Sequence, residues 1–385
     1  MSRALSISAL NTVEVGATAD QTKADIDSLG INRGRNNLII NGDMKVAQRA
    51  TSVTGLGANG GTYSTVDRYR FDFGSTAGRL TATQTAITDL AGFSKCTKLD
   101  CTTADTSIAA GEYFQFVQRL EGQDIQRLAY GTSSAKTTTV SFYVKGTAKT
   151  YMCELHDAEN TRLVQQQFNV TTSWTRVSLT FAGNTSGTIA DSAALGLYLN
   201  FWLHAGSTYT SGTYNANTWK SQVNADRAVG IGSFFSSTSN ELFITGIQFE
   251  TGSVATDFEH RTYAENLLAC QRYYEIIADG GYDVDHMFGI GHGVKSDQIN
   301  WFYDFKAVKR AAFTLIVASV SGGYHAKNHS VYKHPSNTSL GMTATVQSLH
   351  SISAYMTSIS GVTEQSAWTM QLNGAACHIA VSAEL

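Results

Sequence analysis

The most conspicuous group of reactive side chains in this sequence lies in one segment, residues 324–334. It contains two tyrosines and three histidines: Tyr324, His325, His329, Tyr332 and His334. Histidines four and five residues apart could converge on a metal ion, since neutral imidazole is a common ligand. However, the segment contains no Cys or carboxylate to complete a metal site. We therefore interpret it as an exposed loop that contacts a ligand, with an anionic glycan favoured by its two lysines.

Two carboxylates and an imidazole follow one another in Asp283-Val284-Asp285-His286. Alternate residues of a strand share a face, so Asp283 and Asp285 could bind calcium or divide acid and base duties. The simpler interpretation is the polar start of a strand. Three further carboxylates are possible calcium ligands: Asp43, Glu241 and Glu250. No dense Asp/Asn/Gly loop surrounds them, so we predict no metal, no cofactor and no catalytic residue.

Glycine-containing motifs give no sign of an enzyme. Residues 289–293 (GIGHG) do not match the dinucleotide pattern GxGxxG, and a nucleophile elbow GxSxG is absent. Glycines at this spacing in a strand favour close packing against a neighbouring strand.

Aromatic residues interrupt a polar stretch at residues 205–221. Tyr209 and Tyr214 could stack on sugar rings, or they could close the end of the fold. For Trp219 we favour the second role, as a buried plug.

The composition indicates which elements must position these residues. Charged residues make up only 15% of the 385 residues, and there are 34 Gly and a single Pro. Thr, Tyr and Phe favour strands and Gly supplies turns, so we predict an all-β protein. A surface with few charges repels neighbouring chains weakly, which favours association.

Charge and hydropathy exclude several partners. A net charge of -3 is unsuited to phosphate neutralisation, so we predict no nucleic-acid binding. No apolar run is long enough for a membrane-spanning helix, and we see no signal peptide. The five cysteines fit reduced core thiols made in a cytoplasm, with a Cys96–Cys101 pair as the alternative.

Four parts are predicted along the chain. Residues 1–36 are polar and hold a capping box at Thr18, which indicates a short helix in an attachment segment. Residues 37–261 alternate as strands, beginning at 37–40, and form a large antiparallel jelly-roll sandwich. A second capping box at Thr262 predicts a connecting helix within 262–277. Residues 278–385 form a smaller C-terminal β-sandwich, the tip.

Several stretches resemble a β-sandwich domain of bacteriophage tail fibres. Residues 37–49 (NLIINGDMKVAQR) and 63–70 (YSTVDRYR) resemble its opening. Residues 116–122 (FVQRLEG) and 140–146 (VSFYVKG) resemble its middle, while 243–253 (FITGIQFETGS) and 258–261 (FEHR) resemble its close. NLLACQRYY at 266–274 is similar to the helix that leaves the domain. The last hundred residues look like the distal sandwich of such fibres, although Phe313 stands where proline is frequent.

The resemblance implies a jelly roll similar to carbohydrate-binding modules, in a homotrimeric virion protein. Residues 1–36 would contact other virion proteins. The chain would be a non-enzymatic tail fibre, made in the host cytoplasm, that binds a host surface glycan or lipopolysaccharide. One alternative is a structural fibre or capsid appendage without receptor contact. Another is a depolymerase that cleaves surface polysaccharide, although a repetitive β-helix and a clear acid pair are both missing.

Overall fold

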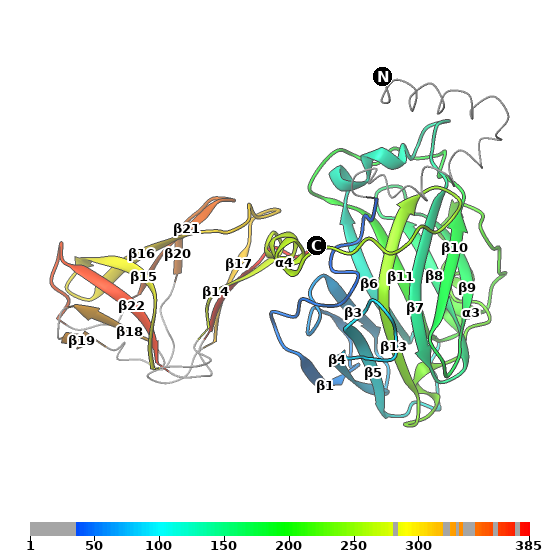
Figure 1. Ribbon diagram of the computed structural model, residues 1–385, viewed down its shortest axis with the longest axis horizontal. Coiled ribbons are helices and arrows are strands. Elements are labelled where there is room, and N and C mark those ends of the chain that lie inside the picture. The colour runs from blue at the N-terminus through cyan, green and yellow to red at the C-terminus, as the bar shows by residue number, and fades with distance from the viewer. Residues whose placement is uncertain are drawn as a thin grey trace, which may run out of the picture. The chain divides into compact units, whose positions relative to one another are not determined.

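Strands form nearly all of the regular structure, as the Thr-, Tyr- and Gly-rich composition predicts (Figure 1). The computed structural model describes residues 36–279, 284–318, 324–328, 331–333, 343–356, 361–373 and 378–385. The predicted attachment segment 1–36 lies outside these residues except for Asn36.

The larger sandwich consists of two antiparallel sheets. The six-stranded sheet has the order β1 (Ser52–Leu56), β4 (Arg79–Ala86), β5 (Lys95–Thr103), β13 (Glu241–Thr251), β7 (Thr138–Gly146), β10 (Thr175–Phe181). The seven-stranded sheet has the order β12 (Lys220–Ser221), β9 (Arg162–Val170), β8 (Lys149–Asp157), β11 (Leu195–Ala205), β6 (Tyr113–Glu121), β3 (Tyr69–Gly74), β2 (Gly60–Thr62). Short helices join some strands: η1 (Gly122–Leu128), α3 (Ser207–Thr210), η2 (Asn224–Asp226) and η3 (Phe234–Ser236). This arrangement confirms the predicted jelly-roll sandwich.

Alternation along the strands creates the core between the two sheets. In β3, Tyr69, Phe71 and Phe73 point inward, and the intervening Arg70 and Asp72 lie on the other face. Aromatic rings fill much of this core; Phe73, for example, stacks on Phe114 with 4.8 Å between ring centroids. Such rings bury large apolar areas and stabilise the sandwich without polar partners.

A second hydrophobic core lies in the C-terminal part of the chain. One sheet has the order β14 (Tyr274–Asp279), β23 (His378–Ser382), β17 (Thr314–Ala318). The other has the order β19 (Val331–Lys333), β18 (Tyr324–Asn328), β22 (Ala367–Asn373), β15 (Val284–Lys295), β16 (Gln298–Asp304), β21 (Ser351–Met356), β20 (Thr343–Gln347). The predicted smaller sandwich is therefore confirmed. Residues Asn37–Leu385 form one compact unit, and the predicted domain boundaries stay predictions.

The helix α4 (Tyr263–Gln271) begins at the predicted capping box. Thr262 Oγ1 accepts a hydrogen bond from the Glu265 amide at 3.2 Å, and the Glu265 carboxylate accepts one from the Thr262 amide at 3.0 Å. The helix ends earlier than its apolar pattern suggests, because Tyr274 already belongs to β14 and pairs with Ser382. Pairing with β23 outweighs the local helical pattern.

Two predicted local structures are wrong. Residues 37–40 form no strand; their amides bond individually, as when Leu38 N donates to Phe249 O at 2.8 Å. Within the predicted loop 324–334, the described residues 324–328 and 331–333 are strands instead, because β18 pairs with both β19 and β22. Polar side chains conceal strands of this kind, since the pairing uses backbone groups.

Other expectations from the sequence agree with the structure. Cys96 and Cys101 are buried free thiols, which excludes the alternative of a bond between them. Residues 289–293 lie in β15, where a Cβ at Gly291 would sit 2.5 Å from Asn300 O, so the strands pack as closely as predicted. Among the described residues, no helix is long and apolar enough to cross a membrane.

The C-terminal residues contact the larger sandwich. Tyr63 Oη donates to Leu385 O at 3.2 Å, while the Glu384 carboxylate pairs with Arg49 and Arg68. Arg68 is fully buried, and its guanidinium lies 3.4 Å from the ring centroid of Tyr273. Charged groups from both cores therefore meet at this contact.

Candidate ligand-binding site

A polar cavity of about 280 Å³ opens on the outer face of the seven-stranded sheet. Its lining comes mainly from β3, β6, β8 and β11: Gly60, Gly61, Arg70, Asp72, Tyr113, Gln115, Arg119, His156, Tyr198, Asn200 and Arg227.

Strand register brings these side chains together. Arg119 of β6 lies opposite Tyr198 of β11, which in turn lies opposite His156 of β8. In the next outward row, Asn200 lies opposite Glu154. Because side chains alternate between the two faces of a strand, the residues that line the cavity are the sequence neighbours of those that fill the core.

Stacked rings form one wall of the cavity. The rings of His156 and Tyr198 lie 5.2 Å apart and within 11° of parallel. The Arg119 guanidinium lies 5.3 Å from the Tyr198 ring centroid. Burial lowers the pKa of His156 below its ordinary value of 6.5, so the imidazole is neutral at pH 7. His156 and Arg119 come from the two strands beside β11 and cover the two faces of the Tyr198 ring, so the uncharged ring pair offers a ligand its apolar C–H edges.

Ion pairs hold the polar side chains of the cavity in place. Arg70 Nε lies 2.7 Å from an Asp72 carboxylate oxygen, and Arg119 Nη2 lies 3.5 Å from the other. Arg227 donates two hydrogen bonds to Glu154, at 3.0 and 2.6 Å. Burial alone would raise the pKa of Glu154, but the ion pair with Arg227 outweighs it and lowers the pKa. Glu154 is therefore ionised at neutral pH.

Several buried polar atoms at the cavity have no hydrogen-bond partner within the described part of the chain. They include Arg119 Nε, His156 Nε2 and Asn200 Oδ1. Asn200 is 2% exposed, and its amide nitrogen already donates to Glu154 at 2.8 Å. Buried groups of this kind are costly unless something bonds to them. The cavity therefore suits a ligand with several groups that both donate and accept.

A segment between β11 and β13, residues 206–232, covers the neighbouring part of this sheet. Tyr209 contacts Trp202 and Tyr113, with ring centroids 5.1 and 5.4 Å apart. Tyr214 Oη accepts a hydrogen bond from Gln167 N at 3.0 Å. Both predicted glycan-contacting tyrosines are half-buried beside the cavity, so their contact with a ligand stays a prediction.

Trp219 lies elsewhere on the sandwich and is half-buried against its core. Its Nε1 donates to Ala182 O at 2.6 Å, and its ring meets Tyr130 edge-on at 5.5 Å. Trp219 therefore packs on the core as the favoured plug would, but it is half-buried and not buried.

The other predicted contact residues are in the C-terminal part. Tyr324 and His325 belong to β18 and Tyr332 to β19, whereas His329 and His334 lie outside the described residues. Of the group considered above, Asp283 is also outside, while Asp285 and His286 belong to β15. A receptor contact by residues 324–334 stays a prediction.

The three carboxylates considered for calcium do not form a common site. Asp43 pairs with Lys45 at 3.0 Å and accepts from Asn266 at 3.1 Å. Glu241 and Glu250 stand at opposite ends of β13, and Glu250 accepts from Thr256 Oγ1 at 2.7 Å. Asp43 and Glu250 therefore have protein partners of their own.

A second cavity, of about 330 Å³, lies on the six-stranded sheet. Lys145, Thr147 and Phe243 are among its lining residues. The Lys145 ammonium lies 4.9 Å from the Phe243 ring centroid and 5.0 Å from that of the nearby Trp174. This cavity lacks a stacked pair of rings and has fewer fixed polar groups.

The sequence did not single out Arg119, His156, Tyr198 or Asn200. A usable signal was present, because polar residues alternate with core residues in LYLNFW (197–202) and in the strand containing Arg70 and Asp72. The pairing register of the four strands cannot be read from the sequence, so it was not predictable which outward residues would meet at one cavity.

Comparison with known proteins gave no match to a family model and none to a curated protein. Among solved structures, the chain is similar to the enzymatically active domain of bacteriophage CBA120 tailspike protein 4, at 11% identity and a TM-score of 0.29. That match covers 56% of this chain and 21% of the tailspike chain.

Carbohydrate-binding modules are also similar in structure. One is a family 61 module in complex with β-1,4-galactotriose, at 7% identity and a TM-score of 0.31, covering 57% of this chain and 100% of that one. Another is the family 11 module of a Clostridium thermocellum cellulase, at 11% identity and a TM-score of 0.24, covering 58% and 97%. At these values no property of the similar proteins transfers to this chain.

Proposed function

We propose that this chain is a glycan-binding protein whose ligand occupies the cavity lined by Tyr198, His156 and Asn200. The observation that carries the proposal is the combination of a stacked ring pair with buried polar atoms that lack partners. A sugar ring presents an apolar C–H face and, around its edge, hydroxyl groups that both donate and accept. The two features of the cavity match these two features of a sugar.

We further propose that the protein is a phage tail fibre that attaches the virion to a host surface glycan, with residues 1–36 contacting other virion proteins. The support is the resemblance of residues 37–275 to tail-fibre sequences together with a cavity suited to a glycan. A structural fibre without receptor contact is the alternative. Labelling the protein in intact virions tests the location.

Binding without hydrolysis fits the carboxylates of the cavity. Glycoside hydrolysis needs one carboxyl group that holds a proton at working pH and a second that is ionised. The ion pair with Arg227 lowers the pKa of Glu154, and Asp72 pairs with two arginines. Incubating host polysaccharide with the protein should release no oligosaccharides, whereas a released product would establish a depolymerase.

The first prediction concerns the ring pair. Tyr198→Ala removes the ring that stacks on His156, and we expect the dissociation constant for host polysaccharide to rise at least about tenfold, or about 1.4 kcal/mol. Isothermal titration calorimetry of the purified protein measures this change. Trp174→Ala, a half-buried aromatic residue beside the second cavity, is the matched control and should bind normally.

Normal binding by Tyr198→Ala, with its melting temperature unchanged, would overturn the cavity as the glycan site. Loss of binding in Tyr324/His329/Tyr332→Ala instead would assign recognition to residues 324–334. Loss in Trp174→Ala alone would assign it to the second cavity.

A further inference from the structure

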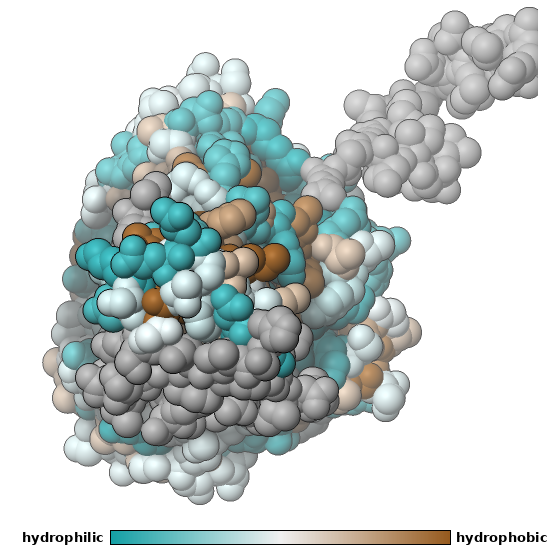
Figure 2. Space-filling view, turned by 90° about the vertical axis from the view of Figure 1, so that its left-hand side faces the viewer, coloured by the Kyte–Doolittle hydropathy of each residue, from teal (hydrophilic) through white to brown (hydrophobic). Residues whose placement is uncertain are grey.

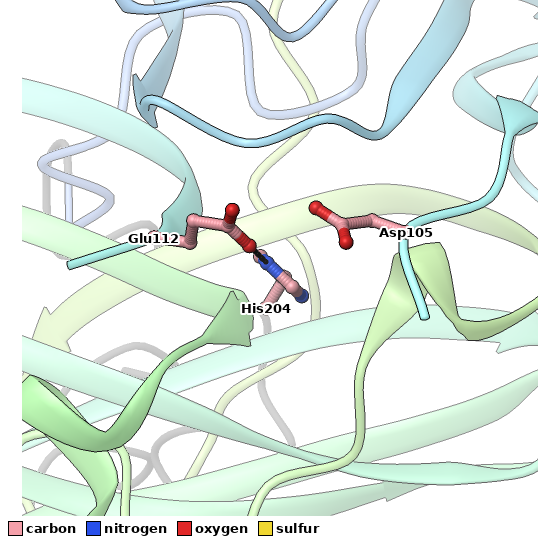
Figure 3. A group of neighbouring side chains, drawn as sticks. All are labelled: Asp105, Glu112 and His204. Atoms are coloured by element: carbon pink, nitrogen blue, oxygen red, sulfur yellow. Dashed lines mark ion pairs between the residues drawn. The ribbon is translucent and has the colours of Figure 1, made fainter. Parts of the chain in front are cut away.

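Three buried side chains converge away from the glycan cavity (Figure 3). Asp105 follows β5, Glu112 directly precedes β6, and His204 lies in β11. One carboxylate oxygen or ring nitrogen from each residue lies within 4.8 Å of the others. The exposed fractions of the residues are 4%, 6% and 0%, so their charged forms are poorly solvated.

Neighbouring residues orient two of these groups. The Asp105 carboxylate accepts hydrogen bonds from Thr76 Oγ1 and Ala77 N, both at 2.9 Å. The Nδ1 atom of His204 lies 2.8 Å from Ser233 Oγ, a hydrogen bond that directs the other ring nitrogen toward the carboxylates. Such a bond to the distal nitrogen is typical of histidines that bind metal ions.

Two atoms that face the centre of this cluster have no hydrogen-bond partner within the described residues. They are Glu112 Oε2 and His204 Nε2, which lie 3.6 Å apart, too far for a hydrogen bond. The carboxyl groups of Asp105 and Glu112 can bond to each other only through a shared proton. That proton would still leave His204 Nε2 without a partner, whereas a divalent cation would accept electron pairs from all three residues.

We propose that Asp105, Glu112 and His204 bind one transition-metal ion of the Zn²⁺ type. The imidazole nitrogen decides the class, because Ca²⁺ and Mg²⁺ take oxygen ligands, whereas Zn²⁺ binds mixed nitrogen and oxygen sets. Tetrahedral Zn²⁺ with bonds of about 2.1 Å places its ligands about 3.4 Å apart, close to the 3.6 Å between His204 Nε2 and Glu112 Oε2. The Asp105 oxygen, which lies within 4.8 Å of the other two ligand atoms, would complete the set.

The ion would fasten separate elements together. The segment between β5 and β6 already bonds to its surroundings through Asp105 N to Phe235 O at 2.7 Å and Gly206 N to Glu112 O at 2.8 Å. Gly206 begins the segment that carries Tyr209 and Arg227 to the glycan cavity. The role is therefore structural, and it holds whether or not the cavity binds glycan.

Metal content and thermal stability of the full chain test the site. After removal of metal with EDTA, added Zn²⁺ should bind at one ion per chain in native mass spectrometry. A hundredfold excess over the dissociation constant is worth about 2.7 kcal/mol and should raise the melting temperature by about 4 °C. When Co²⁺ is added in place of Zn²⁺, the protein should show the visible absorption bands of a Co²⁺ ion that has a nitrogen ligand.

Amino-acid substitutions distinguish Zn²⁺ binding at this cluster from Zn²⁺ binding to histidines on the surface. His204→Gln and Glu112→Gln should lose the bound ion and the rise in melting temperature, while the exposed His350→Gln should keep both. If the folded wild-type chain takes up no Zn²⁺ and its melting temperature does not change, the proposal is wrong. The carboxyl groups of Asp105 and Glu112 then share a proton and bind no metal ion. The wild-type measurements decide this even if the variants fail to fold.

Discussion

At the scale of single residues, Asp67 is a buried carboxyl group beside Gln48 and Arg49. The residue is 1% exposed and accepts a hydrogen bond from Gln48 N at 2.9 Å, with Arg49 Nη1 3.9 Å away. Burial raises the pKa of Asp67 from 3.8 to about 6, because these partners compensate only in part for lost solvation.

This pKa gives a stability prediction with a definite sign. The folded state binds the Asp67 proton more tightly than the unfolded state, so its contribution to stability is full below pH 3.8 and is lost as the pH rises to about 6. The loss is about 3 kcal/mol in the free energy of unfolding. Asp67→Asn should remove this part of the pH dependence, which urea denaturation between pH 4 and 7 measures.

Asp297→Asn, a change at an exposed turn, is the control and should keep the wild-type pH dependence. Identical pH profiles for wild type and Asp67→Asn would show that the carboxyl group is not desolvated as the structure indicates.

The two sites differ in how far the sequence predicts their residues. The outward alternation of Tyr198 and Asn200 is visible in the sequence, so a polar face could be expected even without its register. The cluster of Asp105, Glu112 and His204 has no local signature, because His204 is 92 residues from Glu112 along the chain and sits in an apolar run. This cluster was therefore not among the groups that the sequence singled out.

At the scale of elements, β13 contains a bulge opposite β7. The pairing register with β7 shifts between Thr245 and Gln248, and Gly246 within this bulge has a φ of 63°. A Cβ at Gly246 would lie 2.8 Å from the Phe93 ring and 2.9 Å from that of Tyr143. Both the backbone conformation and the rings therefore require glycine.

We expect Gly246→Ala to lower the free energy of unfolding by about 3 kcal/mol, from left-handed strain and from overpacking. Gly55→Ala is the matched control, since Gly55 has a φ of 77° with nothing within 4 Å of its added Cβ. Its cost should be about 1 kcal/mol, from strain alone. Equal costs in urea denaturation would mean that the rings around Gly246 move aside.

Strands with alternating aromatic residues could be predicted, and others could not. The alternation is visible in β3, β6 and β11, but it is absent from β4 and β5, where RLTATQTA and KCTKLDCTT are rich in threonine and charged residues. β14 was not predicted, because Tyr273 and Tyr274 continue the apolar spacing of the helix α4. In each case, pairing with a distant strand decided the structure.

At the scale of the whole molecule, the surface bears on assembly. Gly291 pairs with Trp301, so the next residues, Ile290 and Phe302, are neighbours on β15 and β16, and they are 62% and 66% exposed. Among the coloured residues of the face in Figure 2, hydrophobic groups alternate with hydrophilic ones. Such mixed surfaces, with few charges, suit contact between copies of one chain.

We therefore expect a homotrimer, with Ile290 and Phe302 between subunits. Sedimentation of the full chain should give three copies, and Phe302→Asp should reduce the mass to that of one copy. Val254→Asp, at a 64% exposed apolar residue of the sandwich, should leave the trimer intact. A folded wild-type monomer at micromolar concentration would contradict the prediction.

The buried Arg68 limits how this protein can be taken apart. Its guanidinium pairs with Glu384 and covers the ring of Tyr273, and neither partner belongs to the larger sandwich. In the complete chain, Glu384→Gln would leave this cation buried without its carboxylate, and an unpaired buried charge costs about 3–5 kcal/mol. Exchanging C-terminal parts between related chains therefore requires the donor to bring an acidic residue in the place of Glu384, or the recipient to give up its arginine.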